Sequence, residues 1–501
     1  MDLFEVLATV TSFDVALTVL LCTLYGSIVG AMPGLSASMA VALLVPFTYF
    51  MSPLLACAAI VSTTLATVFA GDISSTLLRI PGTPASAAYV DDAHGLALKG
   101  KARTALFISL FCSVIGGLIG VAALVFASTS LARFAADFSS VESFWLASLG
   151  LTCAVFVGGP SAARNLASLM IGLAIATIGI DVGVGYPRFT FGNLDLLDGV
   201  SFICAMIGLF AVTELFRSAG GKKNPVLTGA KLESMWQAAR NAWKELRTRK
   251  VAILRSGGIG TLIGVIPGAG ADVAAWIAYG VSRKTSRNPE LYGTGTPDGI
   301  ISPSSANNAA VAGSWTPALV FGIPGDSITA IAVGVLLMKG LNPGPQIFSG
   351  DLTLVYAIFG SFALANVILL FSGAFAIYAG SSILRVPQSI LMTSVMMLSV
   401  VGAYAVVQSV HGVWVVAAMG LVGFLLIKAS IPLAPAILGL VLGRVLEDNF
   451  MLSIMKSQGD LGYFFSRNIA AVLGGMTLLL WGLLIYGAVR RVMRSRQLSK
   501  T

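Results

Sequence analysis

Two neighbouring amides, Asn307 and Asn308, lie in the run Ser304-Ser-Ala-Asn-Asn-Ala, where they could bind both an anion and a cation. An amide donates hydrogen bonds to a carboxylate through its NH2 group, and its oxygen accepts hydrogen bonds or coordinates a cation. Arg79 directly precedes an Ile-Pro-Gly sequence, and its planar guanidinium matches the two oxygens of a carboxylate. These residue types predict a site for an organic anion. For Arg79, the alternative is an ion-paired or interfacial structural residue.

Three aspartates, Asp72, Asp272 and Asp326, lie close to helix-breaking Pro-Gly pairs and are candidates for ion coupling. A carboxylate beside carbonyl groups that a helix break has freed could hold Na⁺ or carry a proton. Helix capping is the alternative, because Asp326 and Thr83 each follow a Pro-Gly pair, at a position where a side-chain oxygen can accept from the first helical turn. The two roles do not exclude each other.

The Pro-Gly pairs occur at four places that form two related sets. Pro33-Gly34 and Pro81-Gly82 have counterparts in Pro267-Gly268 and Pro324-Gly325, offset by 234 and 243 residues. Matching breaks indicate an internal duplication, with copies near residues 15–135 and 250–380. Proline removes a backbone donor and glycine lets the chain turn, so a broken helix presents N–H groups and the positive end of its dipole to an anion. Such breaks in two repeats are typical of a transport site.

The predicted site combines these breaks with the polar residues around them. The expected substrate contacts are Gly34, Arg79, Pro81, Gly82, Thr83, Gly268, Ser304, Asn307, Asn308 and Gly325. The expected ion-coupling residues are Asp72, Asp272 and Asp326, and the remaining helix breaks are Pro33, Pro267 and Pro324. The sequence leaves open whether the two copies are inverted.

The elements that carry these residues must be membrane helices. Of the 501 residues, 56% are apolar and 11% are charged, whereas about 25% are charged in soluble domains. Stretches without charge, such as 104–132 and 352–384, exceed the roughly 20 residues that span a bilayer. The alternation typical of outer-membrane barrels is absent. The sequence therefore predicts an all-α polytopic membrane protein with roughly 10–12 transmembrane helices and excludes an ordinary soluble enzyme.

Basic residues concentrate in two places. Ten of the 31 Lys and Arg residues lie between Arg217 and Arg255, and five more lie between Arg490 and Lys500 without any acid. The positive-inside rule assigns both segments to the cytoplasm and explains them better than nucleic-acid binding does. The predicted segments are 1–216, a transmembrane half with the first repeat; 217–255, a basic cytoplasmic linker; 256–380, the second repeat; 381–489, further transmembrane helices; and 490–501, a basic cytoplasmic tail.

Within the linker, apolar side chains recur at steps of four and three and predict a helix with one apolar face. That face comprises Leu232, Trp236, Ala239, Trp243 and Leu246. It fits a helix that lies along the membrane surface and, equally, a helix that packs on its own protein.

The chain lacks the residues for common hydrolytic and metal chemistry. His94 and His411 are its two histidines, so the sequence lacks the histidines that a zinc-peptidase helix or a histidine-based catalytic triad requires. The five cysteines lie in apolar runs without close pairs, which favours helix packing over disulfides or metal binding. We therefore expect no enzymatic activity, no metal site and no cofactor, apart from Na⁺ or H⁺ as a coupling ion.

Over nearly its whole length the chain resembles the large membrane subunit of the tripartite tricarboxylate transporters, the TctA family. The motifs that carry the resemblance are Gly30-x-x-Pro33-Gly34, Leu77-Leu-Arg-Ile-Pro81-Gly-Thr-Pro84, Pro187-Arg-Phe-Thr-Phe-Gly192, Gly264-x-x-Pro267-Gly-Ala-Gly270, Ala306-Asn-Asn-Ala309, Gly322-Ile-Pro-Gly325 and Gly340-Leu-x-Pro343-Gly-Pro345. The resemblance implies a multi-pass secondary transporter of the bacterial inner membrane, driven by an ion gradient. It also implies two partners: a small membrane subunit, and a periplasmic solute-binding protein that delivers a tricarboxylate, a dicarboxylate or a related acid.

One position departs from the family pattern. The family commonly has Glu three residues before the Asn-Asn pair, and this chain has Ser304. If that Glu serves ion binding, the resemblance implies that another acid, Asp326 or Asp272, takes its place here, or that coupling differs. The resemblance does not name the carboxylate or the ion. The alternative from another functional class is a membrane scaffold or receptor component that binds a periplasmic protein without moving solute.

Overall fold

The computed structural model describes residues 3–32, 35–157, 161–181, 185–218, 233–267, 270–350, 352–383 and 388–498. Contacts divide the chain into two compact units, each built from two separate stretches. Unit 1 comprises Met1–Ala135 and Ser201–Lys428, and unit 2 comprises Ala136–Val200 and Ala429–Thr501. The units do not coincide with the predicted segments, because residues 136–200, predicted within the N-terminal transmembrane half, group with the C-terminal residues 429–501 in unit 2.

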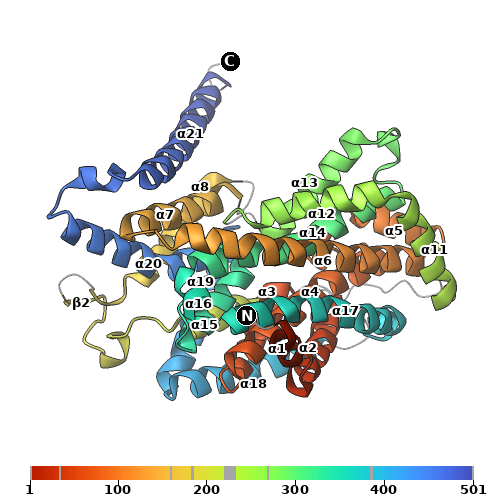
Figure 1. Ribbon diagram of the computed structural model, residues 1–501, viewed down its shortest axis with the longest axis horizontal. Coiled ribbons are helices and arrows are strands. Elements are labelled where there is room, and N and C mark those ends of the chain that lie inside the picture. The colour runs from red at the N-terminus through yellow and green to blue at the C-terminus, as the bar shows by residue number, and fades with distance from the viewer. Residues whose placement is uncertain are drawn as a thin grey trace. The chain divides into compact units, whose positions relative to one another are not determined.

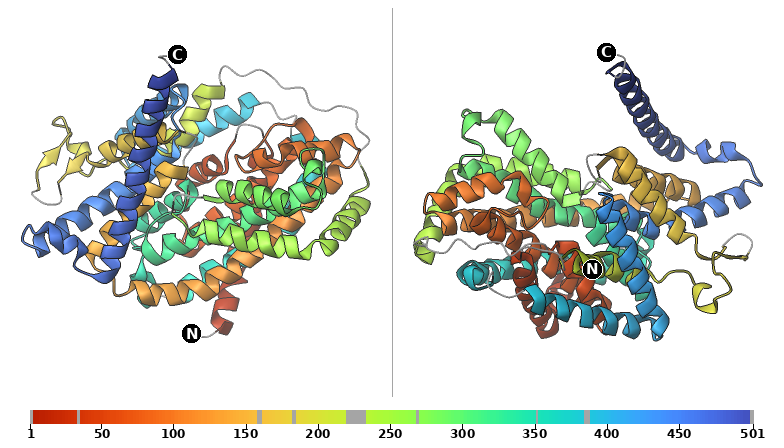
Figure 2. Two further views of the ribbon diagram at one scale, coloured as in Figure 1. Left: turned by 90° about the horizontal axis from the view of Figure 1, so that it is seen from above. Right: turned by 180° about the vertical axis from the view of Figure 1, so that it is seen from behind.

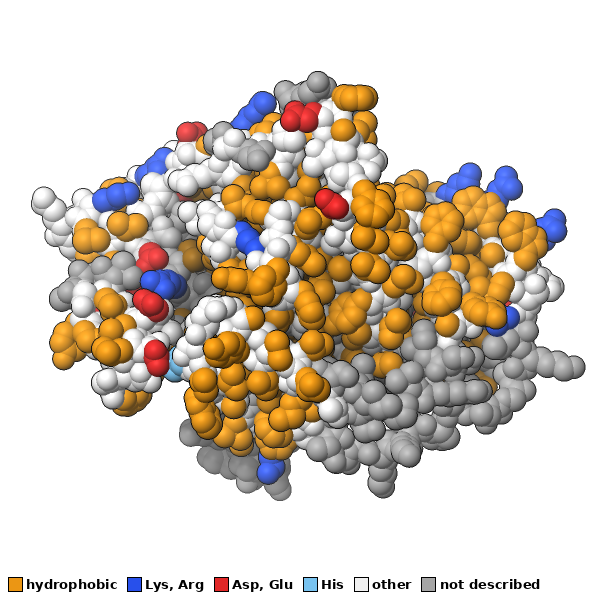
Figure 3. Space-filling view, turned by 90° about the horizontal axis from the view of Figure 1, so that it is seen from below, with side chains coloured by type: hydrophobic (Ala, Val, Ile, Leu, Met, Phe, Trp, Pro, Cys, Tyr) orange, Lys and Arg blue, Asp and Glu red, His pale blue; other side chains and the backbone are white. Residues whose placement is uncertain are grey.

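The described chain is helical except for short connections and one small hairpin, and its longest helices are apolar. Within the described residues, six helices are long and apolar enough to cross a membrane: α2 (Phe13–Ala31), α4 (Pro53–Leu78), α6 (Ala102–Ala135), α17 (Leu352–Ile383), α19 (Val410–Lys428) and α21 (Asn468–Leu498). Hydrophobic side chains cover much of the face drawn in Figure 3. These features confirm the prediction of an all-α polytopic membrane protein.

Unit 1 contains both predicted copies of the repeat (Figure 1). The first copy comprises α2, α3 (Ala37–Thr48), α4, the 3-10 turn η1 (Ser86–Ala88), α5 (Val90–Leu98) and α6, preceded by α1 (Leu3–Val10). The second comprises α12 (Lys250–Gly264), α13 (Gly270–Thr285), η4 (Pro289–Leu291), α14 (Pro297–Phe321), α15 (Ser327–Met338), α16 (Pro345–Gly350) and α17. The remaining elements of unit 1 are α9 (Phe202–Ile207), the π-helical η3 (Gly208–Val212), α10 (Thr213–Ser218), α11 (Met235–Thr248), α18 (Gln388–Val407) and α19.

In each copy, two glycines of the first helix pack against the backbone of the long helix. A Cβ atom on any of them would come too close to a carbonyl oxygen: 2.6 Å for Gly26 and Thr63, 2.5 Å for Gly30 and Thr67, 2.1 Å for Gly260 and Ala306, and 2.4 Å for Gly264 and Ala310. The glycines are offset by 234 residues and their partners by 243, as the break motifs are. Helix α2 therefore packs on α4 as α12 packs on α14. Helix α6 also packs on α12 and α14, and these three helices stay side by side in Figure 2.

The two copies run in opposite directions. Lys99, directly after α5, donates to the carbonyl group of Thr294 at 2.8 Å, just before α14 begins. Helix α5 folds back on the C-terminal turn of α4, so α14 begins where α4 ends. In the second copy Lys339, directly after α15, donates to the carbonyl of Tyr49, just before α4, and the chain after it returns to Leu319 near the end of α14. The long helices are therefore antiparallel, as in an inverted repeat.

Unit 2 holds helices from two distant parts of the chain. Its elements are α7 (Ser140–Val157), α8 (Ala162–Ala176), the strands β1 (Gly179–Ile180) and β2 (Pro187–Arg188), η2 (Leu194–Leu196), α20 (Ala434–Lys456), η5 (Leu461–Phe465) and α21. The strands pair antiparallel. Helices α8 and α20 run parallel, because Ser168 contacts Pro432 near the start of both and Gly443 packs on Ala176 further along. Helix α7 contacts the segment between α20 and α21, where the Trp145 indole donates to the carbonyl of Phe464 at 2.7 Å.

The linker helix α11 packs on α6. It buries Ala238, Ala242 and Leu246, and the Trp243 ring lies edge-on to Phe111 of α6, with ring centroids 6.0 Å apart. Trp236 and Trp243 remain exposed, Ala239 is half-buried, and Leu232 lies outside the described residues. The predicted face therefore packs partly on the protein and leaves its two indole rings exposed, so both alternatives for this face stay open.

Candidate functional site

A helix ends shortly before each of the four Pro-Gly pairs. Helix α2 ends at Ala31 before α3 begins, and α12 ends at Gly264 before α13 begins. Pro267 lies half-buried in the second of these connections, whereas Pro33, Gly34 and Gly268 lie outside the described residues. The connections at Pro81-Gly82 and Pro324-Gly325 are described in full, and they confirm that both motifs interrupt a helix.

These two described breaks share one backbone geometry. The long helix ends on a left-handed residue in each copy, Arg79 with φ 57° and Gly322 with φ 69°. The chain then folds back, so that a Cβ atom on Gly82 would lie 2.6 Å from the carbonyl oxygen of Gly71 and one on Gly325 would lie 2.8 Å from Ser314 Cβ. Each contact reaches the long helix eleven residues upstream. Only glycine allows this close approach.

Polar side chains in the middle of α14 are buried without partners. Ser304, Asn307 and Asn308 are 1%, 2% and 0% exposed. Among the described residues, nothing hydrogen-bonds the Ser304 hydroxyl, the Asn307 amide oxygen or either polar atom of the Asn308 amide, and the Ser305 hydroxyl is likewise unpartnered. Because native proteins leave few buried polar groups unsatisfied, and each such group is costly, this part of α14 is suited to a polar ligand, an ion or water.

Two of the predicted acids have partners in their own copy. The buried carboxylate of Asp72 accepts from the Tyr89 hydroxyl at 2.7 Å and from Ser109. Asp326 accepts from the Thr329 backbone N–H at 2.8 Å and completes a capping box at the start of α15, which confirms the predicted cap. Thr83 makes a similar reciprocal pair with Ser86, at 3.1 Å for both N–H groups, at the start of η1.

Side chains of α13 in the second copy hydrogen-bond the backbone just after the Pro81-Gly82 break of the first copy. Asp272, in the first turn of α13, accepts from the Ala85 backbone N–H at 3.0 Å, and Trp276 donates to the Pro84 carbonyl at 3.2 Å. Asp272 itself is exposed. The start of its helix lies beside Asp326, because a Cβ atom on Gly270 would lie 3.4 Å from Asp326 Cβ.

Tyr89 connects these groups to α14. Its hydroxyl lies near the Ser304 hydroxyl, and Asp272 is within electrostatic range of it. Among the described residues, however, no three acidic, His or Cys side chains converge as ligands for one metal ion. The structure thus brings together Thr83, Asp272, Ser304 and Asp326, and it draws on both copies of the repeat.

Arg79 stands apart from this cluster. Its side chain is 65% exposed, and its Nη2 atom lies 2.8 Å from Asp91 Oδ1. The structure gives it the ion-paired arrangement, the alternative that the sequence left open. Proline at position 81 is also exposed, whereas Gly82 is buried against α4.

Two interior residues of this region were missed from the sequence. Asp92 is completely buried, and its carboxylate accepts from the Tyr279 hydroxyl and from the backbone N–H groups of Gly293, Gly295 and Thr296 at 2.9–3.1 Å. Asn366 of α17 is also completely buried, and its amide oxygen has no partner among the described residues. The signals were an acid pair among apolar residues at 91–92 and a lone amide in the charge-free run 352–384.

The chain is similar to one known protein family and to two proteins of one organism. A family model for the tripartite tricarboxylate transporter TctA family matches residues 16–438. The chain is 30% identical, over 94% of both sequences, to an uncharacterised 52.8 kDa protein in the TAR-I ttuC' 3' region of Agrobacterium vitis. It is 32% identical to an uncharacterised protein in the TAR-II ttuC' 3' region of the same organism, over 44% of this chain and 90% of that protein. No solved structure matches the chain.

Proposed function

The chain belongs to the tripartite tricarboxylate transporter TctA family and is a multi-pass membrane component of such a transporter, and from this premise we propose that it imports an organic carboxylate. The substrate is a tricarboxylate, a dicarboxylate or a related acid, delivered by a soluble solute-binding protein in the periplasm. A small membrane subunit completes the system in the bacterial inner membrane. Import is driven by a gradient of Na⁺ or H⁺.

One observation carries this proposal: the unpartnered polar atoms of Ser304, Asn307 and Asn308 in the interior of unit 1. The amide NH2 groups and the Ser304 hydroxyl donate to the carboxylate. The start of α15, after Pro324-Gly325, adds the positive end of a helix dipole. The antiparallel copies supply two related halves that can open in turn toward opposite sides of the membrane.

The coupling ion is assigned to the acids that remain near this region. Asp326 and Asp272 lie beside the break loops, and Asp72 lies behind Tyr89. Asp326 and Asp272 are the better candidates, because Asp272 is exposed and Asp326 is half-buried, whereas Asp72 is enclosed by two hydroxyl donors. A scaffold that moves no solute would not explain why polar groups without partners are buried in α14.

The direct test reconstitutes the chain with both partners in liposomes and measures uptake of labelled carboxylate with and without an ion gradient. Replacement of either amide, by Asn307→Ala or Asn308→Ala, removes a charge-assisted hydrogen bond worth about 1.5–3 kcal/mol, so the apparent affinity should fall roughly tenfold to a hundredfold. Asn449→Ala is the matched control, because the Asn449 amide bonds the Val445 carbonyl within its own helix. Unchanged uptake by both α14 variants would refute the site. Absence of gradient-dependent uptake by the parent would favour the scaffold.

Coupling needs a separate experiment. Asp326→Asn keeps an oxygen that can cap α15 but removes the charge. If Asp326 binds the coupling ion, this variant should lose the dependence of uptake on the gradient. Full dependence in Asp326→Asn would leave Asp326 as a helix cap alone and would turn attention to Asp272.

A further inference from the structure

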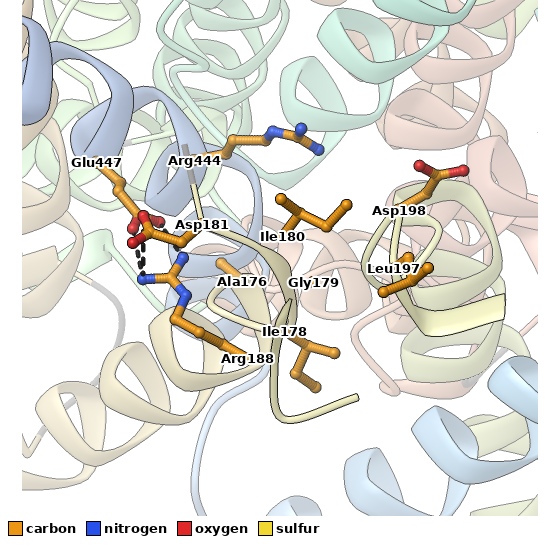
Figure 4. A pocket seen from close by; sticks show the side chains of 10 residues that line it. All are labelled: Ala176, Ile178, Gly179, Ile180, Asp181, Arg188, Leu197, Asp198, Arg444 and Glu447. Carbon is orange, nitrogen blue, oxygen red and sulfur yellow. Dashed lines mark hydrogen bonds and ion pairs between the residues drawn. The ribbon is translucent and has the colours of Figure 1, made fainter. Parts of the chain in front are cut away.

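An ion pair connects the hairpin of β1 and β2 in unit 2 to α20. Arg188 of β2 contacts Glu447 at 2.6 Å and Asp181 at 3.9 Å. The hydrogen bond to Glu447 raises the pKa of the Arg188 guanidinium above its ordinary value, so its charge is permanent. These side chains line one side of a pocket of about 360 Å³, with Asp198 on the other side (Figure 4). The base of the hairpin is therefore held rigidly.

Around and after β2, the chain exposes large apolar side chains. Tyr186, Phe189, Phe191 and Leu194 are 70%, 60%, 91% and 80% exposed, whereas Thr190 between the two phenylalanines is buried. Phe189 and Phe191 adopt left-handed backbone angles, with φ 51° and 50°. Bulky residues rarely take this conformation, and such strain gathers at functional sites. The strained turn lies in the motif Pro187-Arg-Phe-Thr-Phe-Gly192, which the substrate and coupling residues do not use.

The order of elements in unit 2 places the hairpin opposite the basic tail. Helix α21 separates residues 457–467 from that tail, and its apolar part is long enough to cross a membrane. Glu447, in the second half of α20, binds the hairpin, so the hairpin lies toward the end of α20 that leads to residues 457–467. If the basic tail is cytoplasmic, the hairpin faces the outside.

We propose that the segment around and after β2, with Tyr186, Phe189, Phe191 and Leu194 exposed on it, is the surface on which the soluble solute-binding protein docks. Exposed aromatic residues on a rigid support are typical anchors of protein interfaces. Around them, four acids (Asp181, Asp195, Asp198 and Glu447) outnumber two arginines (Arg188 and Arg444), so the partner should carry a basic rim around an apolar centre. A loop that dips into anionic lipid would instead carry an excess of Lys and Arg, whereas the one arginine adjacent to these aromatic residues, Arg188, is paired with Glu447. The inference rests on the proposed function only for the identity of the partner.

The side of the membrane is tested first. Leu194→Cys places a thiol on the exposed segment after β2, and four of the five native cysteines are buried while the fifth is half-buried. We expect a membrane-impermeant maleimide to label Leu194→Cys in intact cells well above the parent. Trp236→Cys on the basic linker should become labelled only after the cells are permeabilised. Labelling of Leu194→Cys only after permeabilisation would overturn the proposal.

Docking is then measured without transport. The chain with its small membrane subunit is placed in nanodiscs of neutral lipid and titrated with the purified, carboxylate-loaded solute-binding protein of the same transporter. We expect the double variant Phe189→Ser with Phe191→Ser to raise Kd at least tenfold and to keep the small subunit bound. Trp236→Ser, which alters an equally exposed ring on α11, should leave Kd unchanged.

The outcomes separate this proposal from the proposed function. An unchanged Kd in the double variant would refute docking at the hairpin whether or not the chain transports. Loss of the small subunit would assign the surface to that partner instead, and a change confined to insertion of the hairpin into anionic vesicles would assign it to lipid. Normal docking by a parent chain that shows no uptake would refute the transport function and leave the docking surface standing.

Discussion

The long helices of the two copies, α4 and α14, have the same packing but different polar chemistry. Two glycines of the first helix of each copy pack against each long helix, and each long helix ends on a left-handed residue. In both copies the glycine of the following Pro-Gly pair contacts the long helix at the residue eleven positions earlier. In α4, the hydroxyl groups bond carbonyls of the preceding turn, for example Ser62 to Ala58 at 2.6 Å and Thr64 to Ile60 at 2.7 Å. In α14, the residue equivalent to Thr64 is Asn307, whose amide oxygen has no partner among the described residues.

This difference between α4 and α14 separates the features of the scaffold from those of the site. Glycine contacts and left-handed helix ends occur in both copies, because the same backbone path requires them. The unpartnered amides occur in one copy only. We infer that the duplication supplies the framework of two crossing halves, whereas recognition of the substrate is concentrated in the second copy.

The hydrogen-bonded contacts between the copies, here called ties, also differ between the two ends of the long helices. Both Lys99 and Lys339 reach a carbonyl group just before the long helix of the other copy. Only the first tie has an additional buried carboxylate, Asp92, which accepts from three backbone N–H groups and a tyrosine of the second copy. The tie at the start of α14 is therefore expected to be the stronger of the two, and the end of the molecule at Lys339 and Tyr49 the easier to open.

Loss of the Asp92 anchor should have the largest effect on stability. Asp92→Asn turns an NH2 group toward some of these N–H donors and removes the charge, so we expect a loss of about 3 kcal/mol in the free energy of unfolding. Thermal unfolding in detergent measures it. Asp91→Asn is the control, because the neighbouring Asp91 side chain is 53% exposed. Equal effects of the two variants would show that the first tie is no stronger than a surface contact.

An exchange between the long helices tests the chemical difference directly. Asn307→Thr gives α14 the residue of the first copy, whose hydroxyl can bond the carbonyl four residues earlier, as Thr64 does. We expect stability to remain near that of the parent while the KM for uptake rises roughly tenfold to a hundredfold, equivalent to about 1.5–3 kcal/mol. The reverse change, Thr64→Asn, should leave KM unchanged. Comparable KM increases in both variants would place substrate contacts in both copies.

The sequence was sufficient for the framework, because proline, glycine and long apolar runs act through the backbone and leave a periodic trace. The four breaks, the duplication and the Asp326 cap were predicted from such residues. It was insufficient where a contact depends on the fold: nothing near Asp92 in the sequence indicates that Gly293–Thr296 would surround its carboxylate. The sequence likewise did not show that Ala238 and Ala242 of α11 would be buried, since it does not reveal how closely α6 approaches that helix.

The shared packing can be broken at one glycine. In α12, a Cβ atom on Gly260 would lie 2.1 Å from the Ala306 carbonyl oxygen, whereas one on Gly258 would meet nothing within 4 Å. We expect Gly260→Ala to destabilise the protein by about 1–3 kcal/mol through overpacking. Gly258→Ala should be neutral or slightly stabilising, because alanine favours a helix. Gly26→Ala, at the equivalent position of α2, should behave like Gly260→Ala. A difference in sign between Gly26→Ala and Gly260→Ala would mean that the copies are not packed alike.

The smallest effect is expected at the helix ends, where the copies differ most in residue type. Arg79 and Gly322 occupy equivalent left-handed positions, and the Arg79 side chain makes an exposed ion pair, a kind worth about 0–1 kcal/mol. Arg79→Gly removes that pair but relieves the backbone, because glycine adopts positive φ without strain. We therefore expect unfolding and uptake to change little, whereas Gly322→Arg should be strongly disfavoured by the Pro343 carbonyl, 2.7 Å from where its Cβ would lie. A large rise in KM for Arg79→Gly at unchanged stability would show instead that Arg79 leaves Asp91 and binds the carboxylate during transport, and the first copy would then also contribute to recognition.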